Sequence, residues 1–157
     1  MDWKRLVQFA LQGSSDLEQY AILLVRVSLG LFFAISGASK LFVAGGTNPV
    51  YETLVKAKVP FPTQTAYFVA GVEFVAGSLV TVGFLSSAAS VALSIDMIVA
   101  ILTNTLSTLP KGLSALSWLD DVLYFPEVLY VLIFIWLIVA GPGKFSVDYW
   151  LAGKLLV

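Results

Sequence analysis

The sequence predicts an all-α integral membrane protein, a four-helix bundle with an amphipathic interfacial helix at its N-terminus. Of its 157 residues, 59% are hydrophobic and only 12% are charged, and the mean hydropathy is +0.91. A soluble domain has about 25% charged residues, and one of about this length buries only about 70% of its unfolded surface. The apolar residues form continuous runs, whereas an outer-membrane barrel would require alternation.

The composition also excludes several kinds of site. The chain has no cysteine and no histidine, so no disulfide, iron–sulfur cluster, His-ligated haem or Cys/His zinc site is expected, and no other metal site is predicted. Nine Lys and Arg residues against ten Asp and Glu residues leave a net charge of −1, so no nucleic-acid partner is expected.

The first predicted element is an amphipathic helix over about residues 2–12. Its apolar side chains recur at helical spacing beside Lys4 and Arg5, without the continuous apolar core or the cleavage site of a signal peptide. These apolar residues are Trp3, Leu6, Val7, Ala10 and Leu11. The helix is expected to lie on the lipid bilayer.

Four apolar runs follow, and a helix needs about 20 residues to cross a hydrocarbon core about 30 Å thick. The predicted spans cover about residues 20–43, 65–84, 86–106 and, slightly too short, 122–140. Four spans place both termini on one side of the membrane, which we call the near side, opposite the far side. Residues 1–157 are therefore predicted to form one domain.

The boundaries of these spans carry helix-ending signals. Ser15 to Glu18 reads as a capping box before the first span, and Gly45 to Pro49 ends it. The turn at Gly83 to Ser87 is so short that the second and third spans must be antiparallel neighbours. Gly141 to Gly143 ends the fourth span, and the connection 107–121 is expected at the interface or dipping into the bundle.

Five ionisable residues fall within the spans or at their edges: Arg26, Lys40, Glu73, Asp96 and Glu127. A charge near the bilayer centre costs about 2.5–3.5 kcal/mol, so each needs a partner or a function. Helical side chains lean toward the N-terminus of their helix, which favours pairing Arg26 with Asp96, and Lys40 with Glu73 or Glu127. One carboxyl then lacks a cation and is a candidate hydrogen-bond donor or proton-transfer group.

Purely structural roles stay open for some of these residues. Lys40 can extend to the headgroups, and Glu127, directly after Pro126, can be a first-turn residue favoured by the helix dipole. Charges on three separate helices, however, favour a polar cavity. The predicted lining adds small and aromatic residues, which are Gly30, Phe33, Gly37, Phe74, Gly77 and Tyr130.

Several short motifs resemble those of the DoxX family of small four-helix membrane proteins, over about residues 22–151. They are Arg26-x-x-x-Gly30, Gly37-x-x-Lys40-Leu41, Glu73-x-x-x-Gly77 with Gly83, Met97-x-x-Ala100, and Gly141-Pro142-Gly143-x-x-Ser146-x-Asp148. The resemblance implies a relation to the DoxD subunit of thiosulfate:quinone oxidoreductase, and hence a membrane redox role with quinone. It carries over Arg26, Lys40 and Glu73 as a shared polar site.

This chain also departs from the family pattern. It has Ser86 and Ser87 where members often have a basic residue, and Asp96 is treated as its own addition.

The sequence leaves three functions open. The first is a quinone-interacting subunit of a membrane oxidoreductase, with walls from Phe33, Tyr67, Phe74 and Tyr130, and with a redox partner protein or a second copy of the chain. The second is a carrier or binding protein for a small amphipathic or acidic molecule, and the third is a non-catalytic assembly scaffold. In each case we expect a multi-pass protein of the cell (inner) membrane, with cytoplasmic termini by a small excess of basic residues on the near side.

Overall fold

The structure is a computed structural model that describes residues 3, 7, 10 and 15–155. The predicted interfacial helix over about 2–12 lies almost wholly outside the described residues. Within them the chain is helical and has no strand, as predicted. The helices are α2 (Ser15–Phe42), α3 (Asn48–Lys56), α4 (Pro62–Val82), α5 (Ser86–Thr103), the 3-10 helix η1 (Thr105–Thr108), α6 (Ala115–Leu123), α7 (Pro126–Ala140) and α8 (Val147–Leu155).

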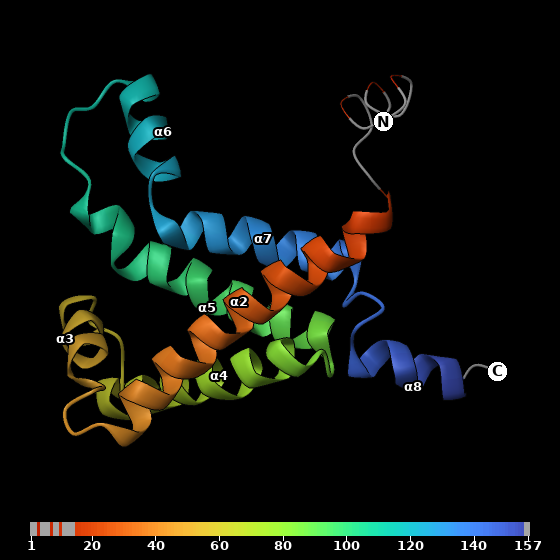
Figure 1. The fold of residues 1–157 in the computed structure, drawn as a ribbon. Coiled ribbons are helices and arrows are strands. Elements are labelled where there is room, and N and C mark those ends of the chain that lie inside the picture. The colour runs from red at the N-terminus through yellow and green to blue at the C-terminus, as the bar shows by residue number, and fades with distance from the viewer. Residues whose placement is uncertain (1–2, 4–6, 8–9, 11–14, 156–157) are drawn as a thin grey trace.

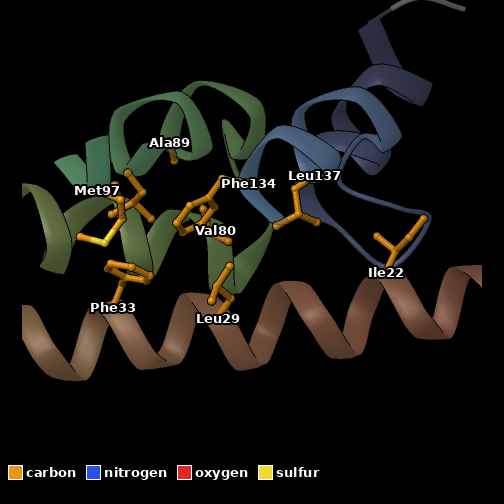
Figure 2. Packing of buried hydrophobic residues seen from close by; sticks show 10 residues of the cluster. Ile22, Leu29, Phe33, Val80, Ala89, Met97, Phe134 and Leu137 are labelled. Atoms are coloured by element: carbon orange, nitrogen blue, oxygen red, sulfur yellow. The ribbon is translucent and has the colours of Figure 1, made fainter. Parts of the chain in front are cut away.

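The long helices form a bundle in which α2 packs along α4 and α5 packs along α7 (Figure 1). We call the end where α2 begins and α4 ends the near end, since it is the predicted near side, and the opposite end the far end. In Figure 1, α8 lies at the near end, whereas α3 and α6 lie at the far end. A buried cluster of apolar side chains joins the four long helices (Figure 2), among them Phe33 from α2, Val80 from α4, Met97 from α5 and Phe134 from α7.

Helices α2 and α4 approach closely because both carry glycine at their contact. A Cβ atom on Gly37 would overlap the backbone of Phe74, and one on Gly77 would overlap the backbone of Ala34. Gly30 faces Thr81 in the same way. Close helix contact through small residues replaces the hydrophobic driving force that is missing in lipid. The prediction that these three glycines line a cavity is therefore wrong.

Three of the described helical segments, Leu17–Phe42, Pro62–Val82 and Ser86–Thr108, are long and apolar enough to cross a membrane. The predicted fourth span, 122–140, is interrupted: α6 and α7 meet at an angle of 68°. Pro126 is the reason, because proline disfavours helical geometry at the preceding residue, and Phe125 is extended. The described residues thus form an all-α membrane helix bundle with three helices long enough to span, or four if α6 and α7 together make one bent span.

Candidate functional site

A cavity of about 320 Å³ lies at the far end of the bundle, between α2, α3, α4, α5 and α7. Its lining contains four of the five predicted ionisable residues, Lys40, Glu73, Asp96 and Glu127. The bundle brings these residues together from four different helices. Helix α3 contributes mainly apolar side chains, including Val50 and Leu54, which cover the cavity from the far end.

Lys40 and Glu73 form an ion pair on one wall of this cavity. The Lys40 ammonium donates to both carboxylate oxygens of Glu73, at 2.6 Å to Oε1 and 2.5 Å to Oε2. Ser36 donates a further hydrogen bond to Oε2 at 3.3 Å. Glu73 is only 4% exposed, so these donors offset the cost of burying its charge. Of the two partners predicted for Lys40, Glu73 and Glu127, the ion pair is formed with Glu73.

Asp96 and Glu127 face the same cavity without such partners. Among the described residues, Oδ2 of Asp96 and Oε2 of Glu127 are buried and accept no hydrogen bond. Glu127 also lies in the first turn of α7, where the helix dipole favours a negative charge. A buried polar atom without a partner costs about 1–3 kcal/mol, which indicates that these oxygens are available to a bound molecule.

Aromatic rings form another part of the cavity wall. Phe33 contacts Tyr130 edge to face, with the ring centroids 5.4 Å apart, and Phe32 lies 5.3 Å from Tyr130. All three line the cavity, as predicted for Phe33 and Tyr130. Phe32 was not predicted to line the cavity, because its neighbour Phe33 lies on the helix face that was expected to point inward. No other sequence pattern indicates a role for Phe32.

Two other predicted aromatic residues do not line the cavity. Phe74 packs against Phe42 on the outside of the α2–α4 pair, with ring centroids 5.7 Å apart. Tyr67 is 52% exposed and points away from the bundle interior.

Arg26 lies elsewhere, so the predicted Arg26–Asp96 pair is wrong. Its guanidinium is 2% exposed and donates to the backbone carbonyls of Val80, Thr81 and Phe145, at 2.8, 2.7 and 2.8 Å. Val80 and Thr81 belong to the last turn of α4, where carbonyls lack the regular partner four residues on and the dipole attracts a cation; the Val80 carbonyl also accepts from the Gly83 N–H at 3.2 Å. Arg26 therefore fastens the near end and takes no part in the far-end cavity.

Two further residues take part in the packing of the near end: Asp148, the last residue of the closing motif, and Gly83. Asp148 accepts hydrogen bonds from the backbone N–H groups of Leu85 and Ser86, both at 2.8 Å, and so caps the start of α5. Gly83 has a φ of +76° and a Cβ there would collide with Arg26 and Ser146, which explains the glycine. In the sequence, Asp148 stands out only as the last residue of the closing motif, and no pattern predicts that it caps α5.

No group of three or more Asp or Glu side chains among the described residues is arranged to hold a metal ion. What the cavity offers chemically is one neutralised ion pair, two carboxyls with free oxygens and an aromatic wall. This combination suits a small ring-shaped ligand that forms hydrogen bonds.

The comparisons with known proteins agree with the fold. The model of the DoxX family matches residues 21–106, which include Arg26, Lys40, Glu73 and Asp96. An uncharacterized membrane protein of Mycobacterium tuberculosis is 29% identical over 131 residues, covering 82% of this chain and 79% of the relative. No solved structure matches the chain significantly.

Proposed function

The chain belongs to the DoxX family, and from this premise we propose that it is a quinone-interacting subunit of a membrane oxidoreductase. The observation that carries the proposal is the pair of unpartnered carboxyl oxygens, on Asp96 and Glu127, in an aromatic-walled cavity of a membrane bundle. A quinone is lipid-soluble, so it would reach such a cavity from the bilayer.

The residues present fit the head group of a quinone. A cavity volume of about 320 Å³ is at the lower end of the usual range for ligand pockets, about 300–1,000 Å³. Phe33 and Tyr130 would hold the flat ring, and Asp96 and Glu127 would accept hydrogen bonds from the hydroxyl groups that the ring carries when it is reduced. The Lys40–Glu73 ion pair would form a further part of the cavity wall without adding net charge.

A bound quinone takes up two electrons and two protons when it is reduced to the quinol. In this chain Asp96 and Glu127 are placed to hold and pass the protons, while the aromatic wall orients the ring and excludes water. The electrons would come from a partner protein that carries a redox cofactor, since the chain has no Cys or His to ligate haem iron or an iron–sulfur cluster.

The test is quinone binding by the purified protein in lipid nanodiscs. We expect saturable binding of a short-tail benzoquinone and of its hydroquinone, and about tenfold weaker binding of the hydroquinone for Asp96→Asn or Glu127→Gln. Asp120→Asn is the matched control, because Asp120 is exposed on α6 away from the cavity. If the folded protein binds no quinone and its lipid extract contains none, the proposal is wrong.

A carrier of small amphipathic molecules is the second candidate, and the charge of the cavity restricts its solute. Three carboxyls against one ammonium line the cavity, which favours a neutral or basic solute over an acidic one. Solute counterflow in liposomes without any redox partner would support the carrier over the oxidoreductase subunit. An assembly scaffold, the third alternative, predicts that Glu73→Gln leaves function intact once folding is verified.

A further inference from the structure

We infer that the cavity selects the reduced, dihydroxy form of its ligand over the quinone form. This inference rests on the proposed function and deepens it by naming the redox state that the site binds. The argument compares the hydrogen-bond donors and acceptors that the cavity leaves free. A ligand binds best when it supplies the groups that the buried site lacks.

The main cationic donor of the cavity is already in use. Lys40 directs two of its three N–H bonds to Glu73, and the Ser36 hydroxyl is directed to the same carboxylate. Glu73 therefore needs no further donor. A quinone carbonyl, which only accepts hydrogen bonds, would have to compete with Glu73 for these donors.

In their ionised forms, the free buried groups are acceptors only. Oδ2 of Asp96 and Oε2 of Glu127 are the cavity-lining atoms that are buried without a hydrogen-bond partner in the described part of the chain. A quinone oxygen placed against either of them would set one acceptor against another. A quinol hydroxyl would instead donate a charge-assisted hydrogen bond, which is shorter and about twice as strong as a neutral one.

The remaining polar groups of the lining leave the oxygens of Asp96 and Glu127 unpaired. The third N–H of Lys40, the hydroxyl of Tyr130 and the amide of Asn104 can donate, and Asn104 is exposed. None of them donates to Asp96 or Glu127. No described residue supplies those two hydrogen bonds, so a bound molecule can, and an aromatic diol carries two donors on opposite edges of a flat ring.

Selection of the quinol has a measurable redox consequence. A tenfold tighter binding of the reduced form raises the midpoint potential of the bound two-electron couple by about 30 mV. The bound quinone would then be a stronger oxidant than the free one, which suits a site that withdraws electrons from a partner protein.

The experiment compares a short-tail benzoquinone with its hydroquinone, kept reduced without oxygen, for binding to the full-length protein in nanodiscs. We expect the hydroquinone to bind at least about tenfold more tightly, and its dimethyl ether, which has no O–H, to lose that advantage. Asp96→Asn and Glu127→Gln should each reduce the hydroquinone-to-quinone ratio by about threefold or more, because an amide also presents N–H donors. Asp120→Asn should leave the ratio unchanged.

The outcomes separate the two proposals. Equal binding of both forms, or tighter binding of the quinone, overturns the inference but leaves quinone binding intact. Binding of neither form by the folded protein overturns both. The ratio in the unsubstituted protein decides the inference even if a variant fails to fold.

Discussion

Arg26 holds the near end of the bundle together with a single side chain. Its guanidinium satisfies carbonyls at the end of α4 and in the segment that precedes α8, which are far apart in the sequence. Because hydrogen bonds to charged groups contribute about 1.5–3 kcal/mol each, Arg26→Ala should lower the free energy of unfolding by about 3 kcal/mol or more. Arg26→Lys should lose less stability than Arg26→Ala, because lysine keeps the positive charge. It should still lose some, because its ammonium lacks the planar guanidinium that donates to several carbonyls at once.

Unfolding in mixed detergent micelles would measure this effect, with Lys56→Ala on the exposed face of α3 as the control.

Asp96→Asn should leave stability nearly unchanged, because its carboxyl has an unpartnered oxygen and forms no salt bridge among the described residues. If Arg26→Ala and Asp96→Ala proved equally harmful and their effects non-additive, the two residues would interact after all.

The ion pair of Lys40 and Glu73 is asymmetric in exposure, which predicts an asymmetric response to mutation. The side chain of Glu73 is 5% exposed and that of Lys40 is 23% exposed. Lys40→Met would strand a buried carboxylate, and breaking such a pair costs about 3 kcal/mol. Glu73→Gln would strand an ammonium that can reach water, so it should cost less.

A double-mutant cycle tests this prediction. The combination of Lys40→Met with Glu73→Gln should recover part of the stability lost in Lys40→Met alone, because no charge then remains buried without a partner. Simple additivity of the two single effects would contradict a direct pair.

At the scale of elements, the contact of α2 with α4 depends on glycine at defined positions. Gly37→Ala should destabilise the protein by about 1–3 kcal/mol, because its Cβ would overlap the backbone of α4 and force the helices apart. Gly71→Ala is the matched control on α4: nothing lies within 4 Å of its Cβ position, so helix propensity should leave it neutral or slightly stabilising. Equal effects of the two substitutions in thermal unfolding would contradict the close packing.

Helix α6 is apolar on one side, yet none of its residues is buried in the bundle. Leu116 is 84% exposed, Leu119 and Leu123 are also exposed, and the 68° bend turns α6 away from the axis of α7. We expect α6 to lie along the far surface of the bilayer with these leucines in the lipid.

The fluorescence of Trp118 would report the depth of α6, in a variant whose other three tryptophans are replaced by phenylalanine. Lipids brominated close to the headgroup should quench it more strongly than lipids brominated near the chain end. Stronger quenching by the deeper bromines would instead place α6 inside the bilayer core.

For the whole molecule, the orientation in the membrane follows from a small charge difference. In the topology predicted from the sequence, the near side carries Lys4, Arg5, Lys144 and Lys154, and the far side carries Lys56, Lys58 and Lys111. By the positive-inside rule we expect cytoplasmic termini. A fluorescent protein fused to the C-terminus should therefore be bright and an alkaline phosphatase fusion inactive; the reverse pattern would place the cavity end in the cytoplasm.

The apolar runs and the ionisable residues of the sequence predicted the membrane bundle and which charged residues face its interior. The backbone N–H and C=O groups of a long apolar run must pair within the run when it lies in lipid, because lipid offers them no hydrogen bonds. A spanning helix pairs all of them. The direction in which helical side chains lean predicted that Lys40 meets Glu73 or Glu127, and Glu73 is the partner. It also placed Glu127 toward the far side, where it lines the same cavity.

The contacts made by Arg26 and by the three glycines could not be predicted without the packing of the helices. Depth along a helix can be counted from sequence, but the rotation of each helix about its axis is set by packing against its neighbours. That rotation turns Arg26 to the carbonyls of α4 and places Gly30, Gly37 and Gly77 in the helix contact, while Asp96 faces the cavity. The carbonyls that bind Arg26 are backbone groups, which every residue carries, so no sequence pattern could have distinguished them from the carboxylate of Asp96.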